Sequence, residues 1–180
     1  FGSYETQLIV TSAQGCKDTV IDSARVNPKP TSDFTFSDTC QPNPIDFTDK
    51  SRVAEGEIVA YGWEFGDKEN STMASPIHPY DSFGRFRASL GVRTNKGCVD
   101  TTRKVVEVFP KPVARFTAEN VCRVDTAIFK DTSSVAGQAS LRAWGWQLGD
   151  STGAAGDSVS HTYAVADTYD VQLIVTTTNG

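Results

Sequence analysis

The sequence has few of the residues from which metal and catalytic sites are usually built. Its 180 residues include only two histidines and one methionine. None of the four cysteines forms a Cys-x-x-Cys pair, and no Asp-x-Asp-x-Asp-Gly loop occurs. These absences argue against zinc and EF-hand calcium sites. We therefore expect no metal, no cofactor and no catalytic residues.

An excess of one charge and long apolar runs are also missing. The net charge is −5, from 17 basic and 22 acidic residues that are interspersed. Such a chain offers no strongly basic surface to nucleic acid or anionic lipid. Its apolar runs are far shorter than the roughly 20 residues of a membrane-spanning helix. We expect no nucleic-acid partner and no membrane insertion.

Helical periodicity is missing too, and short alternating segments stand in its place. Residues 59–65 and 86–93 alternate bulky apolar side chains with small or polar ones. Clusters of Gly, Pro, Asn, Asp and Ser separate these segments, as in turns. The pattern predicts an all-β fold of antiparallel β-sandwiches. Trp63 and Trp146 are expected at the centre of the core, between the two inner faces.

The chain repeats itself. Residues 63–67 (WEFGD) recur as residues 146–150 (WQLGD), and the match extends over the whole sequence at a shift of 82, or 83 after one insertion. Ordered self-similarity of this kind indicates a tandem array. The matched positions include Cys16 and Cys98, Pro28 and Pro110, Phe34 and Phe116, Cys40 and Cys122, Phe47 and Phe129, His78 and His161, and Leu90 and Leu173.

The register predicts three pieces. Residues 1–27 are the C-terminal part of one repeat, residues 28–110 a complete repeat, and residues 111–180 a repeat lacking its last strand. Pro-Lys-Pro joins the pieces at 28–30 and again at 110–112. Each proline restricts its own backbone and that of the preceding residue, so we expect short, stiff joints.

The cysteines follow the same register. Cys40 and Cys98 are the only cysteines of the complete repeat. One pair per repeat suggests an oxidising compartment, and we predict a Cys40–Cys98 disulfide. Cys16 corresponds to Cys98 and Cys122 to Cys40, so their partners would lie outside these 180 residues. Four reduced thiols are the alternative.

Two histidines and two aspartates are the remaining candidates for chemistry. His78 and His161 occupy equivalent positions. A catalytic role would need a nucleophile or a metal set beside them, so we favour rings that bond backbone groups at the start of a strand. Asp67 and Asp150 could be general acids or calcium ligands, but we favour carboxylates that cap their own turns. The sequence does not predict an enzyme.

Several motifs occur in fixed order and have equivalents after residue 144. They are Trp63-x-Phe65-Gly66-Asp67, Pro76-x-His78-x-Tyr80, Gly84-x-Phe86-x-Ala88-x-Leu90-x-Val92 and Asn95-x-Gly97. These motifs resemble those of the PKD repeat, an immunoglobulin-like module widespread in microbial surface and secreted proteins. The resemblance covers all three pieces. One departure concerns the turn, where the family usually has glycine after Gly-Asp and this chain has Lys68 and Ser151.

The cysteine pair and the Pro-Lys-Pro joints are similar to those of long PKD arrays on gliding and polymer-degrading Bacteroidetes. This resemblance implies structural spacer repeats of a large bacterial cell-surface adhesin, used in gliding or attachment and exported by the type IX route. The partners would be neighbouring repeats, with a polysaccharide or protein ligand bound elsewhere in the parent. The alternative is an accessory PKD module that binds substrate for a secreted polysaccharide- or protein-degrading enzyme.

Most aspartates in the chain are followed by Ser or Thr. Turn chemistry and repetition explain part of this excess. Several of these dipeptides also resemble the O-glycosylation sequon of Bacteroidetes. We hypothesise modification at one or more of four positions, which are Thr19, Ser23, Thr126 and Ser158.

Overall fold

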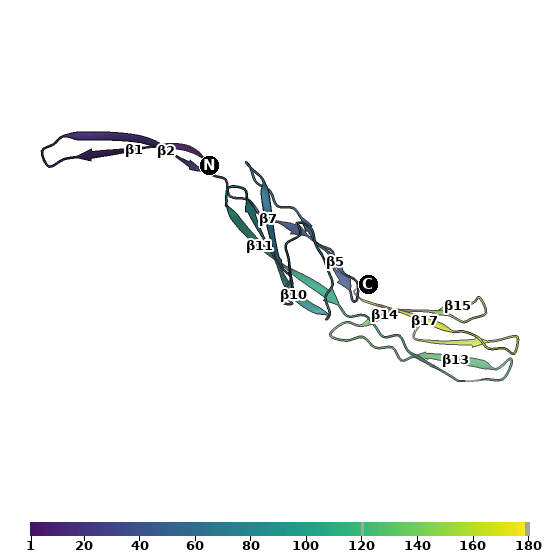
Figure 1. Ribbon diagram of the computed structural model, residues 1–180. Coiled ribbons are helices and arrows are strands. Elements are labelled where there is room, and N and C mark those ends of the chain that lie inside the picture. The colour runs from purple at the N-terminus through teal and green to yellow at the C-terminus, as the bar shows by residue number, and fades with distance from the viewer. Residues whose placement is uncertain (120, 179–180) are drawn as a thin grey trace. The chain divides into compact units, whose positions relative to one another are not determined.

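The computed structural model describes residues 1–119 and 121–178, and the described residues form strands and turns without a helix (Figure 1). The all-β prediction is therefore confirmed. No helix able to cross a membrane exists within these residues. The chain divides into two compact units, one of Phe1–Ser37, Ile45–His78 and Phe86–Val106, the other of Asp38–Pro44, Pro79–Arg85 and Glu107–Gly180.

The strands of residues 1–110 include one hairpin, one five-stranded sheet and two short pairs. Sheet order is β4-β11-β10-β7-β8, and the pairs are β3-β6 and β5-β9. The bounds are β1 Gly2–Thr11, β2 Lys17–Val26, β3 Phe34–Thr35, β4 Thr39–Cys40, β5 Ile45–Asp46, β6 Thr48–Asp49, β7 Ile58–Glu64, β8 Asn70–Ser71, β9 Ile77–His78, β10 Gly84–Thr94 and β11 Val99–Phe109.

An aromatic core lies between β7 and the short strands that face it. Trp63 is 1% exposed, and its ring meets Phe34 edge to face, with centroids 5.1 Å apart. Phe47 contacts both Trp63 and Phe65, at 5.5 and 5.1 Å. Edge-to-face and tilted pairs of this kind add to the free energy gained from burial alone. The predicted central position of Trp63 is confirmed.

The last seventy residues build the same sandwich from two three-stranded sheets, β12-β13-β16 and β15-β14-β17. Their core consists of Ala127, Phe129, Trp146, Leu148, Val159 and Leu173, with Trp146 3% exposed. The bounds are β12 Phe116–Ala118, β13 Thr126–Asp131, β14 Leu141–Gln147, β15 Gly153–Ala155, β16 Ser158–Thr162 and β17 Gln172–Thr177.

The hairpin β1–β2 has the apolar pattern of a buried pair of strands, but no layer formed by residues 1–119 or 121–178 covers it. Its two strands pair along their whole length, from Gly2 with Val26 to Thr11 with Lys17. Leu8 is 59% exposed, whereas its equivalent Leu90 in β10 is fully buried.

The predicted Cys40–Cys98 disulfide is wrong, since the described residues contain no disulfide. Cys40 ends β4 and pairs with Phe109 at the end of β11, while Cys98 immediately precedes the first residue of that strand. Eleven extended residues span about 35 Å at roughly 3.3 Å each. A disulfide needs Cα atoms within about 7 Å. The count of cysteines per repeat suggested this pair, but it could not show that Cys40 and Cys98 lie next to opposite ends of β11.

Protein purified without reductant is therefore expected to contain no Cys40–Cys98 crosslink. Non-reducing peptide mapping of the monomer by mass spectrometry checks this. A linked pair of peptides carrying Cys40 and Cys98 from one chain would contradict the strand geometry.

Candidate functional site

A buried His–Asp pair lies beside the core in the complete repeat. Nε2 of His78 is 2.7 Å from Oδ2 of Asp67, and the side chain of His78 is 4% exposed. The imidazole stacks on Phe65 with centroids 3.9 Å apart. The other carboxylate oxygen of Asp67, Oδ1, accepts the backbone N–H of Glu69 at 3.0 Å, which caps the turn as expected. The carboxylate thus joins a turn to the last residue of β9.

The same pair occurs in the next repeat. Nε2 of His161 is 2.7 Å from Oδ2 of Asp150. Oδ1 of Asp150 accepts both the backbone N–H and the hydroxyl of Thr152. The predicted capping role of both aspartates is confirmed. The sequence predicted that each histidine ring bonds backbone groups, whereas in the structure each ring bonds an aspartate carboxylate. The repeated spacing of eleven residues between Asp and His was the available signal.

Burial raises the pKa of Asp67, but hydrogen bonds from His78 and the Glu69 backbone outweigh it and hold that pKa below its ordinary value. The hydrogen bond from the Thr152 hydroxyl lowers the pKa of Asp150, and the hydrogen bond from His161 adds to this effect. Desolvation acts in the opposite direction, and the resulting pKa is about 2. Both carboxylates are therefore ionised in the folded protein at neutral pH.

The low pKa of Asp150 predicts a specific loss of stability in acid. An unfolded Asp titrates near 3.9, so the stabilisation is complete above about pH 4 and is lost as the pH falls toward about 2. We expect Asp150→Asn to lower the melting temperature at pH 6, with the difference from wild type shrinking toward zero by pH 2. Thermal unfolding from pH 7 to pH 2 measures this. The control is Asp157→Asn, and a pH-independent difference for Asp150→Asn would contradict the assignment.

The surroundings of the His–Asp pairs indicate a structural contact. Within residues 1–119 and 121–178, no group of three or more His, Cys, Asp or Glu side chains could hold a metal ion. His78 is covered by Phe65 and lies in the core, out of reach of a substrate. A buried ring held by a turn carboxylate can fix the strand that contains it, and this is the role that the geometry supports.

The turn after Asp67 contains a strained residue. Lys68 has φ of 83° and Ser151 has φ of 72°, in the region that favours glycine. At these two positions the PKD repeat, which the sequence resembles, usually has glycine. A residue with a side chain in this conformation destabilises the folded state by roughly 1–2 kcal/mol. Glycine relieves this strain, but it also raises the conformational entropy of the unfolded chain, which offsets part of the gain.

Lys68→Gly is therefore expected to raise the free energy of unfolding by about 0.5–1 kcal/mol. Urea unfolding of the chain measures the change. Lys96→Gly, in the β10–β11 turn but outside the positive-φ residues, is the control and should not stabilise. Equal effects of the two substitutions would show that relief of backbone strain is not the cause.

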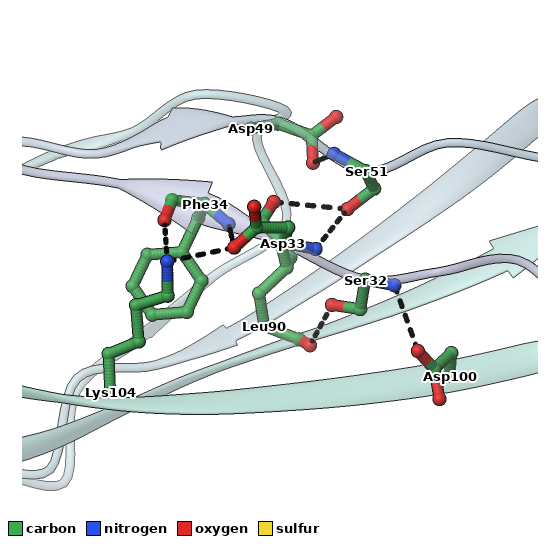
Figure 2. Close-up of polar contacts among 8 residues, drawn as sticks. All are labelled: Ser32, Asp33, Phe34, Asp49, Ser51, Leu90, Asp100 and Lys104. Carbon is green, nitrogen blue, oxygen red and sulfur yellow. Dashed lines mark hydrogen bonds and ion pairs between the residues drawn. The ribbon is translucent and has the colours of Figure 1, made fainter.

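A second polar cluster fixes the segment that leads into the complete repeat (Figure 2). The backbone N–H of Ser32 donates to Oδ2 of Asp100 at 2.8 Å, and its hydroxyl donates to the carbonyl oxygen of Leu90 at 2.8 Å. Nζ of Lys29 is 2.6 Å from the other oxygen of Asp100. Hydrogen bonds from Lys29 and Ser32 hold the pKa of Asp100 below its ordinary value. The Pro-Lys-Pro joint is thereby tied to β11.

Lys104 extends this cluster along β11. Its ammonium group is 2.8 Å from Oδ1 of Asp33, donates to the carbonyl oxygen of Phe34 and lies 5.1 Å from the Phe34 ring centroid (Figure 2). Hydrogen bonds from Lys104 and the Phe34 backbone lower the pKa of Asp33. Such a cation covers the aromatic face that would otherwise meet water. Sequence analysis missed this contact because Lys104 is 70 residues from Phe34.

A serine bridge in Figure 2 recurs in the next repeat. The backbone N–H of Ser51 donates to Asp49, and its hydroxyl donates to the carbonyl oxygen of Asp33 at 3.2 Å. Ser133 makes the same two bonds to Asp131 and Arg115. The repeated Asp-x-Ser spacing could have revealed this bridge in the sequence.

The four candidate glycosylation residues lie on exposed strand positions. Thr19 and Ser23 are in β2, and in each case the preceding aspartate accepts the residue's own backbone N–H, at 2.9 and 2.7 Å. Thr126 is in β13, where its hydroxyl lies 3.3 Å from that of Thr162, and Ser158 begins β16. Modification at these positions stays a prediction.

The fold and the repeated sites define a class of protein, that of non-catalytic immunoglobulin-like β-sandwich modules in tandem. The family model of the PKD domain matches residues 27–108 and 110–180. Because these matches cover most of the chain, it belongs to the PKD domain family. The module is not an enzyme.

The curated relatives are much longer proteins. A 65-residue stretch is 40% identical to collagenase ColA of Clostridium perfringens and covers 36% of this chain and 6% of that protein. A 58-residue stretch is 36% identical to pre-pro-metalloprotease PrtV of Vibrio cholerae and covers 32% and 6%. The crystal structure of the PKD1 domain of Vibrio anguillarum Epp has 28% identity and a TM-score of 0.44, covering 46% of this chain and 96% of that domain.

Proposed function

We propose that this chain is an accessory PKD segment of a secreted enzyme that degrades protein or polysaccharide, and that it acts outside the cell. The observation that supports this most directly is the similarity to segments of a collagenase and a metalloprotease. The core and turn residues recur in both repeats and serve the fold. The outer faces of the strands therefore remain for contact with a substrate. The proposed role is binding of the substrate beside a separate catalytic domain.

Direct binding tests this proposal. The chain is incubated with fibrillar collagen, chitin or cellulose and sedimented, and the unbound fraction is measured against concentration. We expect saturable binding to one of these polymers, weakened by loss of an exposed aromatic. Phe83→Ser is the test variant because Phe83 is 42% exposed, and Met73→Ser, at a residue 65% exposed, is the control. Absence of binding to all three polymers would overturn the proposal.

A second candidate is a spacer in a large bacterial surface adhesin, of the kind that takes part in gliding and is exported by the type IX route. Its support is the tandem repetition, in which one core, one turn and one His–Asp pair recur. A spacer needs modules that each resist unfolding, and it needs no affinity for polymers. The parent protein separates the two candidates, since a catalytic domain favours the first and many further repeats favour the second.

A further inference from the structure

A polar hollow of about 680 Å³ lies on the outer face of the sheet in the complete repeat. The strands β7, β10 and β11 run side by side there (Figure 1). Gly62 of β7 pairs with Gly91 of β10, and both residues line the hollow. A Cβ at Gly62 would meet nothing within 4 Å. The paired glycines therefore form a floor on which a ligand can approach the backbone closely.

Polar side chains of both kinds surround this floor. Glu64 of β7 and Asn70 of β8 lie on one side of it, and Arg103 of β11 lies on the other. Ser89 lies beneath them, with an exposed fraction of 6%, and its hydroxyl donates to Oε2 of Glu64 at 3.3 Å. The hollow thus presents a held carboxylate acceptor, an amide and a guanidinium donor.

Three arginines make this face positive. Arg87 and Arg93 of β10 lie two residues before Ser89 and two residues after Gly91, so the alternation of the strand puts them on the same face. Together with Arg103 they are exposed, and among residues 1–119 and 121–178 none of the three has an ion-pair partner. These arginines are scattered in the sequence, and only the sheet collects them.

The other two pieces of the chain differ at the same places. By the register, Gly91 corresponds to Ile9 and Ile174, which are 54% and 52% exposed. The equivalents of Arg87 are Glu5 and Asp170, and those of Arg93 are Thr11 and Thr176. The fold therefore needs neither glycine nor arginine on this face. The hollow and its charge belong to the complete repeat and call for an explanation other than folding.

We propose that this face binds a polyuronate, an extended polysaccharide whose rings carry carboxylates and free hydroxyl groups. Its carboxylates pair with Arg87, Arg93 and Arg103, because the planar guanidinium fork matches two carboxylate oxygens. Its hydroxyl groups donate to Glu64 and accept from the amide of Asn70. The sugar rings lie over the glycine floor between these groups.

The spacing and the mixed charge select this class of ligand. Arg87 and Arg93 are separated along β10 by roughly 20 Å at about 3.3 Å per residue, which a chain spans and a single anion does not. Phosphates of a nucleic acid would meet the carboxylates of Glu64 and Glu69, which both line the hollow. A sulfated sugar carries its charges on hydroxyl oxygens and so loses donors that Glu64 accepts.

The test measures binding of the 180-residue chain to polygalacturonate by isothermal titration calorimetry at low salt. We expect saturable binding, and none to the fully methyl-esterified polymer, which has the same backbone without the charges. Salt at about 1 M, where the screening length is about 3 Å, should weaken binding at least tenfold. The site does not depend on the proposed function, since a chain that binds none of collagen, chitin and cellulose can still bind a polyuronate.

Chain variants locate the site. The double variant Gly91→Ile with Arg93→Thr introduces the residues of the last repeat, and a Cβ at Gly91 lies at an ordinary 3.5 Å from Oγ1 of Thr101. It should bind at least tenfold more weakly, because the floor is filled and a charge-assisted bond is lost. Arg52→Ser is the control and should bind as the wild type does.

The control is matched in charge and origin. It removes one arginine and introduces the residue of the last repeat, Ser134, but Arg52 pairs with Thr31 outside the five-stranded sheet. Circular dichroism checks that each variant folds. If the double variant does not, Arg103→Gln replaces it, with weaker binding expected, and the comparison of the two polymers stands in either case.

Four results would overturn the proposal. One is no binding of polygalacturonate at concentrations up to 1 mM, roughly the weak limit of specific recognition. Another is equal binding of the charged and the esterified polymer. A third is equal weakening by Arg52→Ser and by the double variant. The last is tighter binding of single-stranded DNA or heparin at the same salt, since a nucleic acid or a sulfated polysaccharide would then be the occupant.

Discussion

Replacing Gly66 with alanine is expected to lower the free energy of unfolding by about 3 kcal/mol or more. Gly66 has φ of +89°, and a Cβ at this position would lie 2.7 Å from the backbone nitrogen of Arg87 and 2.9 Å from its carbonyl oxygen. Both atoms belong to β10 and cannot rotate away. The energetic cost of the positive φ and that of the steric clash therefore add, and urea unfolding measures the total loss in the free energy of unfolding.

Gly62→Ala is the matched control, since Gly62 lies in β7 and a Cβ there meets nothing within 4 Å. The same pair can be tested in the next repeat. Gly149 has φ of +85° with Asp170 backbone atoms at 2.8 and 2.9 Å, whereas Gly145 is open. Equal costs for Gly66→Ala and Gly62→Ala would show that the turn is not held against β10.

Trp63→Ala is expected to cost about 3–5 kcal/mol, which is enough to unfold many small domains. The indole is 1% exposed, contacts Phe34, Phe47 and Phe65, and donates its N–H to the carbonyl oxygen of Met73 at 2.9 Å. The substitution leaves a cavity and removes this hydrogen bond. Equilibrium unfolding followed by circular dichroism gives the cost.

Trp63→Phe separates the two contributions, because it keeps most of the packing and loses the N–H donor. We expect a cost about 2 kcal/mol smaller than that of alanine. Trp146 offers an independent copy, with 3% exposure and an N–H bond of 2.8 Å to the carbonyl oxygen of Gly156. A cost below about 1 kcal/mol for Trp63→Ala would contradict a central place in the core.

The features that the sequence predicted well are local or repeated. Alternation sends Trp63 and Phe65 to one face of a strand whatever the strand packs against. Gly66 and Asp67 form a turn through contacts within a few residues. Because these signals recur eighty-odd residues later, repetition separated structural residues from candidate catalytic ones. For the same reason the sequence predicted a structural role for His78, although the partner that the structure gives its ring is the Asp67 carboxylate and not a backbone group.

The failures concern contacts between residues distant in sequence. The Cys40–Cys98 pairing assumed that two cysteines of one repeat meet, but β11 places them at its opposite ends. The contact of Lys104 with Phe34 depends on how one strand crosses another layer. The carboxylate partner of His78 also escaped prediction, although both residues were identified as candidates.

The sequence by itself determined the all-β class, the repeat register, the central tryptophans and the Gly-Asp turns, because period-2 alternation and turn chemistry act over a few residues. Only the tertiary structure decided which side chains meet across strands. It placed Cys40 away from Cys98, joined His78 to Asp67, and brought Lys104 to the ring of Phe34. The reason is physical, since a strand's own residues set its faces while its neighbours in the sheet and the opposite layer set its partners.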